Sequence, residues 1–391
     1  MINLDYASHT QADEEVLAQF CKIERECAGN PLAAHQIGCE AREVMTRATE
    51  GIAALFDMPV GGVPDRVNVQ PNEIIYTSGA SEANNLAVKG IARAYAHMGR
   101  HILSTCLEHP SVSGALTFLS ENGFEIELLK ILKNGKIDLS HLKNVMRNDT
   151  VLLCVSAVDS ELGAIQPLEE ISEVVKNFPN CHLHIDAAQA MGKIPLLNRP
   201  VRESAGSSNL NASTLCFSPH KFHGLGGFGV LVKRDGVVLE PLIHGGSAAN
   251  GLLYRGGTPS PAMAAACFFA LKKALENQEK NLQYVTSLRN YLLENLPATM
   301  RVNSPPDGSP YILNLSTANI KGTEFQAALN ERGIAVSVKS ACATENSPSR
   351  PVFAVTGDKK NALNSWRVSF SHYTTIRELE IFLSAVKSIL N

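Results

Sequence analysis

The stretch STLCFSPHKFHGLGGFG, residues 213–229, joins an apolar run to a lysine that lies between two histidines and precedes several glycines. Residues 213–218 have the length and apolar character of a buried strand. Lys221 follows this strand, which is an unusual place for an ordinary surface charge. Two interpretations stay open from this stretch alone. Lys221 is either a connecting-loop lysine or a partly desolvated lysine that forms a Schiff base with a carbonyl compound.

Short apolar runs of the same kind recur over the first two thirds of the chain. Strand candidates lie at 73–78, 101–106, 150–158, 182–186 and 229–234, and helical patterns at 11–27, 35–57, 79–99, 111–121 and 168–177. Strands that alternate with helices predict an α/β fold with a mainly parallel sheet covered by helices on both faces.

The pattern changes after about residue 260. Helices are expected near 261–278, 280–295, 323–332 and 375–390, with strands at 311–316 and 366–371. We therefore predict a large domain over 15–260 and a smaller α+β domain formed by 1–14 and 261–391. The serine- and proline-rich stretch 343–351 is expected to be an irregular, mobile loop of the smaller domain.

The predicted strands end in polar or glycine-containing clusters, namely SGASEA, LEHPS, DSELG, DAAQ and SPHKFHG. Ligands of open α/β sheets bind at the carboxyl ends of the strands, so these clusters are expected to converge on one site. Asp186, with Gln189 three residues later, could keep the nitrogen of a pyridine ring protonated through its carboxylate. The same residue is equally well explained as the N-cap of the next helix. The turn before Ala80 is expected to expose main-chain N–H groups at a helix N-terminus, which suits a phosphate. His109 is either a histidine that stacks on a cofactor ring and transfers protons, or an ordinary loop histidine.

Composition narrows the classes of function. A net charge of −3 does not favour nucleic acid or an anionic membrane surface as a partner. The N-terminal MINLDYASHT does not resemble a signal peptide, and no apolar run of about 18 residues predicts a membrane span. The nine cysteines form no CxxC pair or Cys/His array, so we expect no metal site. We expect the protein to be cytoplasmic with its thiols reduced, and most of the cysteines to pack in the core.

Nine segments together resemble, in chain order, those of NifS/IscS-type cysteine desulfurases: LDYASHT, GNPLAAH, TSGASEANNLA, EHPSV, HIDAAQ, SPHKFHGLGG, RGGT, SACA and RVSFSHYTT. The resemblance extends from Leu4 to the last predicted helix. That family belongs to the class V aminotransferases, so the resemblance implies the fold type I architecture of transferases that use pyridoxal 5′-phosphate. It also implies a homodimer.

The resemblance assigns roles to individual residues of this chain. Lys221 would carry the cofactor, Asp186 would pair with its pyridine nitrogen, and His109 would stack on the ring and transfer protons. Gln189 and Ser160 would lie at the ring hydroxyl. The phosphate-binding residues would be Ala80, Ser81, Ser218, His220 and, from the partner subunit, Thr258. The substrate-binding residues would be Arg367, at the carboxylate, and Asn30.

The implied reaction converts L-cysteine to L-alanine and leaves the sulfur as a persulfide on Cys342. The long interval between Cys342 and Arg367 is that of the IscS-like branch and implies a loop that delivers sulfur to an acceptor, for iron–sulfur cluster assembly or for tRNA or cofactor thiolation. Lys339 replaces the usual glycine, and its charge would lower the pKa of the Cys342 thiol.

Several differences from the family keep other functions open. Asp159 and Ser160 replace the usual two asparagines, the Glu–Arg pair after HGG is absent, and no scaffold-docking tail is expected after the last helix. One alternative is a related lyase that uses the same cofactor, such as a selenocysteine lyase. Another is a non-catalytic sulfur-relay scaffold, although such a scaffold would not need Lys221, Asp186 and Arg367 together.

Overall fold

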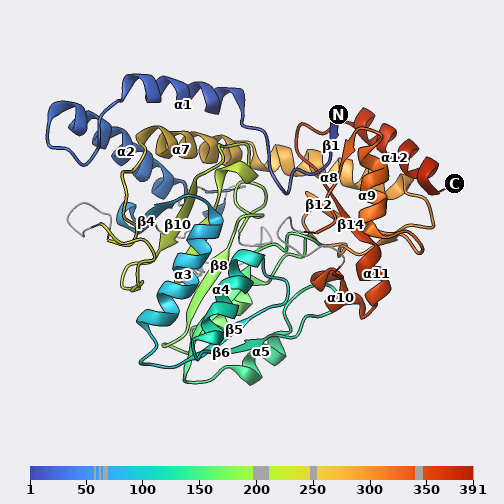
Figure 1. Ribbon diagram of the computed structural model, residues 1–391, viewed down its shortest axis with the longest axis horizontal. Helices are drawn as coiled ribbons and strands as arrows, with labels where there is room; N and C mark the ends of the chain where they lie inside the picture. Colours follow the sequence, from blue (N-terminus) through green and yellow to red (C-terminus); the bar gives the residue numbers. More distant parts are fainter. Residues whose placement is uncertain are drawn as a thin grey trace.

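The computed structural model describes residues 1–56, 69–196, 211–246, 253–339 and 347–390, with the backbone of a short hairpin, β2 (Pro59–Val60) and β3 (Val63–Pro64). Its centre is a seven-stranded sheet in the order β4-β10-β9-β8-β7-β5-β6 (Figure 1). The strands are β4 (Ile74–Thr77), β5 (His101–Ser104), β6 (Glu125–Leu128), β7 (Thr150–Ser156), β8 (His182–Asp186), β9 (Thr214–Phe217) and β10 (Gly229–Lys233). Only β10 runs antiparallel to its neighbours, so the predicted mainly parallel sheet is confirmed.

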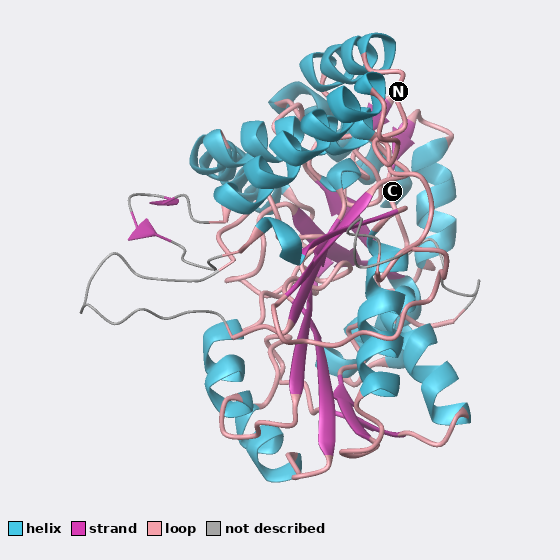
Figure 2. Cartoon of the chain, turned by 90° about the vertical axis from the view of Figure 1, so that its left-hand side faces the viewer, coloured by secondary structure: helices cyan, strands magenta, loops and turns pink. Residues whose placement is uncertain are grey.

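Helices cover both faces of this sheet, as Figure 2 shows. They include α3 (Ala80–Ala94), α4 (Pro110–Glu121), α5 (Leu139–Val145), α6 (Leu168–Val175) and the packed group α1 (Glu14–Glu26), α2 (Gln36–Leu55) and α7 (Pro261–Glu276). Successive strand residues belong to different core clusters, since Ile102 and Cys216 pack on one face and Leu103 and Phe217 on the other. Burial on both faces explains why the strands are continuously apolar rather than alternating.

The last third of the chain forms a second, antiparallel sheet in the order β11-β12-β14. Its strands are β11 (Arg301–Val302), β12 (Ile312–Ser316) and β14 (Ser365–Ser369), and its helices are α8 (Gln278–Asn295), α9 (Gly322–Asn330) and α12 (Ile376–Leu390). The first residues of the chain join this part, because β1 (Ile2–Asn3) pairs with β13 (Ile334–Ala335). After β1 the chain runs beside Lys221, whose Nζ donates to the main-chain carbonyls of Ala7 and Ser8.

The expectation of irregular structure over 343–351 is wrong at its C-terminal end. Helix α10 (Arg350–Thr356) begins there, with the Ser349 side chain accepting a hydrogen bond from the main-chain N–H of Val352. Pro351 lies in the first turn, where a proline is favoured because the missing N–H has no helical partner anyway. Helix α11 (Lys359–Asn364) was also not predicted. Among the helices of the described ranges, none is long and apolar enough to cross a membrane.

Candidate active site

Lys221 ends the short 3₁₀ helix η2 (Pro219–Lys221) that follows strand β9, as the strand–turn pattern indicates. Its Nζ donates to the main-chain carbonyls of Ala7 (2.8 Å) and Ser8 (2.7 Å). The same N-terminal segment is fastened to the lysine turn, because Thr10 donates from both N–H and Oγ1 to the His220 carbonyl. The structure therefore places Lys221 beside the N-terminal segment, whose main-chain carbonyls accept hydrogen bonds from its amine.

Asp186 and His109 belong to one hydrogen-bond network. Asp186 ends β8, and its Oδ2 accepts from Asn84 Nδ2 at 2.8 Å. Asn84, fully buried on α3, also donates to Ser111 Oγ (2.8 Å), which contacts His109 Nδ1 at 2.8 Å. Oδ1 of Asp186 accepts from the Ala188 N–H (2.9 Å) in the turn after β8, and no helix begins there in the described structure, so the alternative interpretation as a helix N-cap is wrong. A single network therefore fixes the two side chains expected at the cofactor ring.

The proton of the His109 ring is located by its contacts. The main-chain N–H of Ser111 donates to Nδ1 (3.1 Å), so Nδ1 is an acceptor and the neutral imidazole carries its proton on Nε2. Burial lowers the pKa of His109; Asp186 opposes this shift, while the positive charges of Lys221 and Arg367 add to it. His109 is thus neutral near pH 7.

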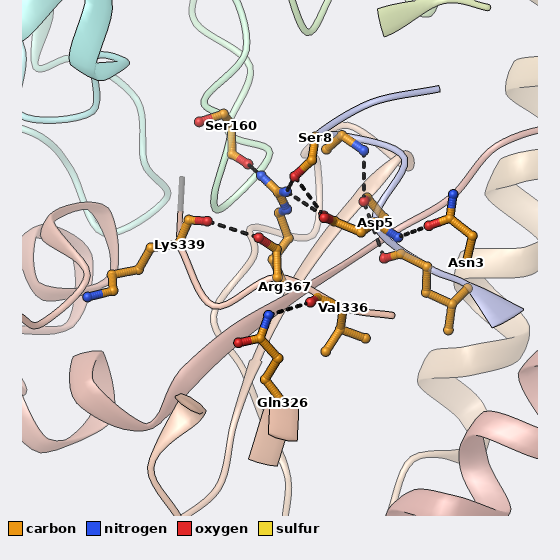
Figure 3. A network of polar contacts seen from close by, with 12 residues as sticks. Asn3, Asp5, Ser8, Ser160, Gln326, Val336, Lys339 and Arg367 are labelled. Atoms are coloured by element: carbon orange, nitrogen blue, oxygen red, sulfur yellow. Dashed lines mark hydrogen bonds and ion pairs between the residues drawn. The ribbon is translucent and has the colours of Figure 1, made fainter. Parts of the chain in front are cut away.

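Arg367 projects from β14 into the same region and is almost fully buried. Nη2 donates to Asp5 Oδ1 (2.7 Å) and Ser8 Oγ (2.8 Å), and Nη1 donates to the Ser160 carbonyl at 2.7 Å (Figure 3). Ser160 thus reaches Arg367 through its main chain rather than its hydroxyl. Within the described residues, Nε of Arg367 has no hydrogen-bond partner. A buried guanidinium with an unused donor suits a second carboxylate.

Gln189 links the N-terminal segment to a lysine that the sequence analysis did not single out. Its Nε2 donates to the Ala7 carbonyl (2.9 Å), and its Oε1 accepts from Lys193 Nζ (3.0 Å). Both side chains are buried. The Ala7 carbonyl therefore accepts hydrogen bonds from Gln189 and Lys221 together.

The predicted phosphate site lies at the N-terminus of α3, where Ala80 and Ser81 form the first turn. The N-cap is Gly79, which has no side chain to cap this end, so the first main-chain N–H groups of α3 give it a positive potential that favours an anion. Glu82 Oε2 accepts from the N–H of Ser78, one residue before the N-cap. A Cβ at Gly229 would lie 2.4 Å from the main chain of Gly79, so only glycine lets β10 pass this turn. These features fit the phosphate of pyridoxal phosphate.

Ser218 and His220 lie in the lysine turn and contact each other. Ser218 Oγ donates to the Phe228 carbonyl (2.7 Å) and lies 2.8 Å from His220 Nδ1. Burial, with the nearby charge of Lys221, lowers the pKa of His220 to about 3, so the ring is neutral. Their phosphate-binding role stays a prediction.

Thr258 and the connection that contains Asn30 border a different cavity from the one that Lys221 borders. Asn30 is exposed in the connection between α1 and α2, where its Oδ1 accepts from the Leu32 N–H (2.9 Å). Thr258 lines a cavity of about 970 Å³ together with Leu32, and Lys221 is not among the residues around that cavity.

Cys342 lies outside the described residues, but both sides of its segment are anchored. Lys339 Nζ donates to the carbonyl (2.7 Å) and to Oγ (3.2 Å) of Ser347. Ser349 Oγ donates to Glu161 Oε2 at 2.6 Å. Lys339 thus has a visible structural contact, and its predicted effect on the Cys342 thiol stays a prediction.

Asp159, which replaces a family asparagine, is buried in the turn after β7. Its Oδ2 accepts from the N–H groups of Glu161 and Leu162, whereas Oδ1 has no partner among the described residues. Burial, with the charges of Glu161 and Glu108, raises the pKa of Asp159 to about 7. The carboxyl group is therefore costly to ionise in the folded protein.

Asp159→Asn is expected to stabilise the protein more at pH 8 than at pH 5. An acid whose pKa rises from 3.8 to about 7 on folding binds more protons in the folded state between those values, so it loses stability as the pH rises through that window. The asparagine removes this loss, which is on the order of 1–4 kcal/mol above pH 7. Urea unfolding at both pH values measures it, with the exposed Glu170→Gln as the control. An equal gain at both pH values would contradict this account.

The residues that sequence reasoning missed are mainly buried connectors. Asn84 was quoted only within a phosphate-binding pattern; a polar residue on an otherwise apolar helix face was the signal that could have revealed its role. The Ala7 and Ser8 carbonyls have no side-chain signal at all. In the described part of the chain, no group of three or more His, Cys, Asp or Glu side chains could hold a metal ion.

Comparison with known proteins identifies the family of the chain. Residues 2–382 match the family described as Aminotransferase class-V. The chain is 32% identical, over its whole length and 94% of the relative, to "Cysteine desulfurase IscS" of Dictyoglomus turgidum. A solved "NIFS-LIKE PROTEIN" matches with TM-score 0.87 and 31% identity over 100% of this chain and 99% of that one. The structure of "SspA in complex with cysteine" matches with TM-score 0.78 and 28% identity over 96% and 100%. The family resemblance is confirmed: the chain belongs to the class V aminotransferases, whose cofactor is pyridoxal phosphate.

Proposed function

We propose that this protein is a cysteine desulfurase, which converts L-cysteine to L-alanine and takes up the sulfur as a persulfide on Cys342. The observation that carries the proposal is that Lys221 and the buried Arg367 both bind one N-terminal segment, while the Asp186–Asn84–Ser111–His109 network places His109 within electrostatic reach of both charges. The relatives named cysteine desulfurase and the cysteine-bound SspA support cysteine as the substrate.

The cofactor would be held by residues whose chemistry matches each part of it. Lys221 supplies the amine, the α3 N-terminus supplies N–H donors for the phosphate, and the Asp186 carboxylate, oriented by Asn84, holds a proton at the pyridine nitrogen. When bound, pyridoxal phosphate withdraws electrons from the substrate Cα and so activates the Cα–H and Cβ–S bonds.

The remaining residues bind the substrate and move protons. Arg367 binds the substrate carboxylate through its guanidinium, with Nε as the free donor and Asp5 as the anion that the substrate must displace or accommodate. His109 is neutral and holds its proton on Nε2, so in this tautomer the ring presents an N–H donor to the bound substrate. Proton transfer through Nε2 needs a second proton to reach Nδ1, which faces the hydroxyl and the main-chain N–H of Ser111.

Cys342 accepts the sulfur atom of the substrate. Its thiolate forms an S–S bond to the substrate sulfur while the Cβ–S bond breaks. The electron pair of that bond stays with the carbon fragment, which takes up protons and leaves as L-alanine. The persulfide sulfur then passes to an acceptor protein, for iron–sulfur cluster assembly or for tRNA or cofactor thiolation, in the cytoplasm.

The function is tested by incubating the purified protein with pyridoxal phosphate and L-cysteine. One L-alanine should form for each sulfur bound or released. A scaffold without activity would form no alanine, and a selenocysteine lyase would form alanine from selenocysteine but hardly any from cysteine. Either result would contradict the proposal.

A homodimer completes the proposed site. Thr258 and the Asn30 connection border a cavity of about 970 Å³ that Lys221 does not line and that also has the exposed Leu253 in its wall. Sedimentation should therefore give twice the chain mass of 42.1 kDa. Thr258→Val should weaken cofactor binding roughly tenfold without changing that mass. A monomer with full activity would contradict the partner role of Thr258.

A further inference from the structure

Lys193 is a buried cation beside the site that the chemistry described above does not use. It lies in the turn after β8 with 6% of its surface exposed. Its Nζ donates to Gln189 Oε1 (3.0 Å) and lies 5.8 Å from the centre of the Tyr311 ring. Burying a lysine costs free energy because its ammonium group loses hydration, and the nearby charge of Lys221 adds to that cost. We therefore asked what the Lys193 side chain contributes to the site.

The contacts of Lys193 determine which way the Gln189 amide points. An amide can turn either its oxygen or its nitrogen toward the site, whereas an ammonium group can only donate. Lys193 therefore takes the oxygen, and Nε2 faces the Ala7 carbonyl, which Lys221 also contacts. When the cofactor occupies Lys221, the Ala7 carbonyl loses the charged donor that it now has, while the contact between Lys193 and Gln189 is independent of it.

We propose that Lys193 is a positioning residue that holds the Gln189 amide with Nε2 facing the cofactor ring. The proposal rests on the function given above, because it needs pyridoxal phosphate on Lys221. With Nε2 facing the ring, Gln189 donates to the ring hydroxyl oxygen and stabilises its anionic form. A reversed amide would instead present an acceptor to that oxygen and to the Ala7 carbonyl, and both contacts would be repulsive.

The charges around Lys193 make its effect dependent on pH. Burial, with the positive charges of Lys221 and Arg367, lowers the pKa of Lys193 to about 7. It borders a cavity of about 290 Å³ whose other titratable side chains are Asp13, Lys221, His223, Lys273, Lys280, Tyr311, His372 and Tyr373. Above pH 7 a neutral amine can accept as well as donate, so the amide is held less firmly. An arginine at this position would stay charged.

The test compares the holoenzyme with Lys193→Met, Lys193→Arg and the control Lys273→Met. Lys273 borders the same cavity, but its Nζ pairs with Asp13 and Glu15 on α1. The measurements are the pH titration of the visible cofactor band and the cofactor dissociation constant. Lys193→Met should weaken cofactor binding about tenfold and shift the titration of the band. Lys193→Arg should keep the wild-type dissociation constant and band position but should show no step in the band titration near pH 7. Lys273→Met should change neither the dissociation constant nor the titration of the band.

A second background separates positioning from a general structural effect. If Lys193 acts through Gln189, then Lys193→Met should add no further spectral shift to Gln189→Ala. A shift of equal size in both backgrounds, or no shift in the single variant, would overturn the proposal. If the wild-type protein shows no visible cofactor band, then the assignment of the cofactor site, and with it the proposed function, is wrong. A band without alanine formation would count against the substrate alone.

Discussion

Lys221→Ala is expected to lose the visible cofactor band and to reduce alanine formation by about 1,000-fold or more. The amine is the only covalent attachment proposed for the cofactor, and the Ala7 and Ser8 carbonyls that accept hydrogen bonds from it cannot form a Schiff base in its place. Absorption spectra and alanine assays with added pyridoxal phosphate measure the two effects.

The control for this prediction is Lys133→Ala, at an exposed lysine in the connection between β6 and α5. It should keep both the band and the activity. A Lys221→Ala protein with an unchanged spectrum would mean that another lysine carries the cofactor, and Lys193 would then be the first candidate because it borders the same cavity.

Cys342→Ser is expected to keep the cofactor band but to abolish persulfide formation. A serine hydroxyl does not attack the substrate sulfur, so sulfur transfer should stop while cofactor binding by Lys221 and Asp186 continues. Spectra, persulfide labelling and sulfide release measure the separation between the two steps.

The matched control is Cys39→Ser, the same substitution at a partly exposed thiol on α2. It should leave persulfide formation unchanged. Normal sulfide release from Cys342→Ser would show that a different nucleophile receives the sulfur, and it would leave the cofactor assignment intact.

The large sheet could be predicted because its strands are buried on both faces. Continuous apolar runs such as 150–158 and 213–218 leave few alternatives for the secondary structure. Lys221, Asp186 and His109 lie, as predicted, at or just after the ends of strands β9, β8 and β5 of the large sheet, and their catalytic roles stay predictions. The edge strand β6 escaped prediction because its sequence EIEL is short and polar at alternate positions.

The connections within the site could not be predicted in the same way. The acceptors for Lys221 are main-chain carbonyls of Ala7 and Ser8, which any residue type would supply. The pairing of Arg367 with Asp5 joins residues at opposite ends of the chain and depends on the strand pair β1–β13 nearby. Only the tertiary structure reveals such contacts.

The central claim is tested most directly by mass spectrometry of the protein after incubation with L-cysteine. The account predicts that the peptide containing Cys342 gains the mass of one sulfur atom, that a reducing agent removes it, and that L-alanine appears in equal amount. Alanine formation with no added sulfur on Cys342, or with the sulfur on another cysteine, would contradict it.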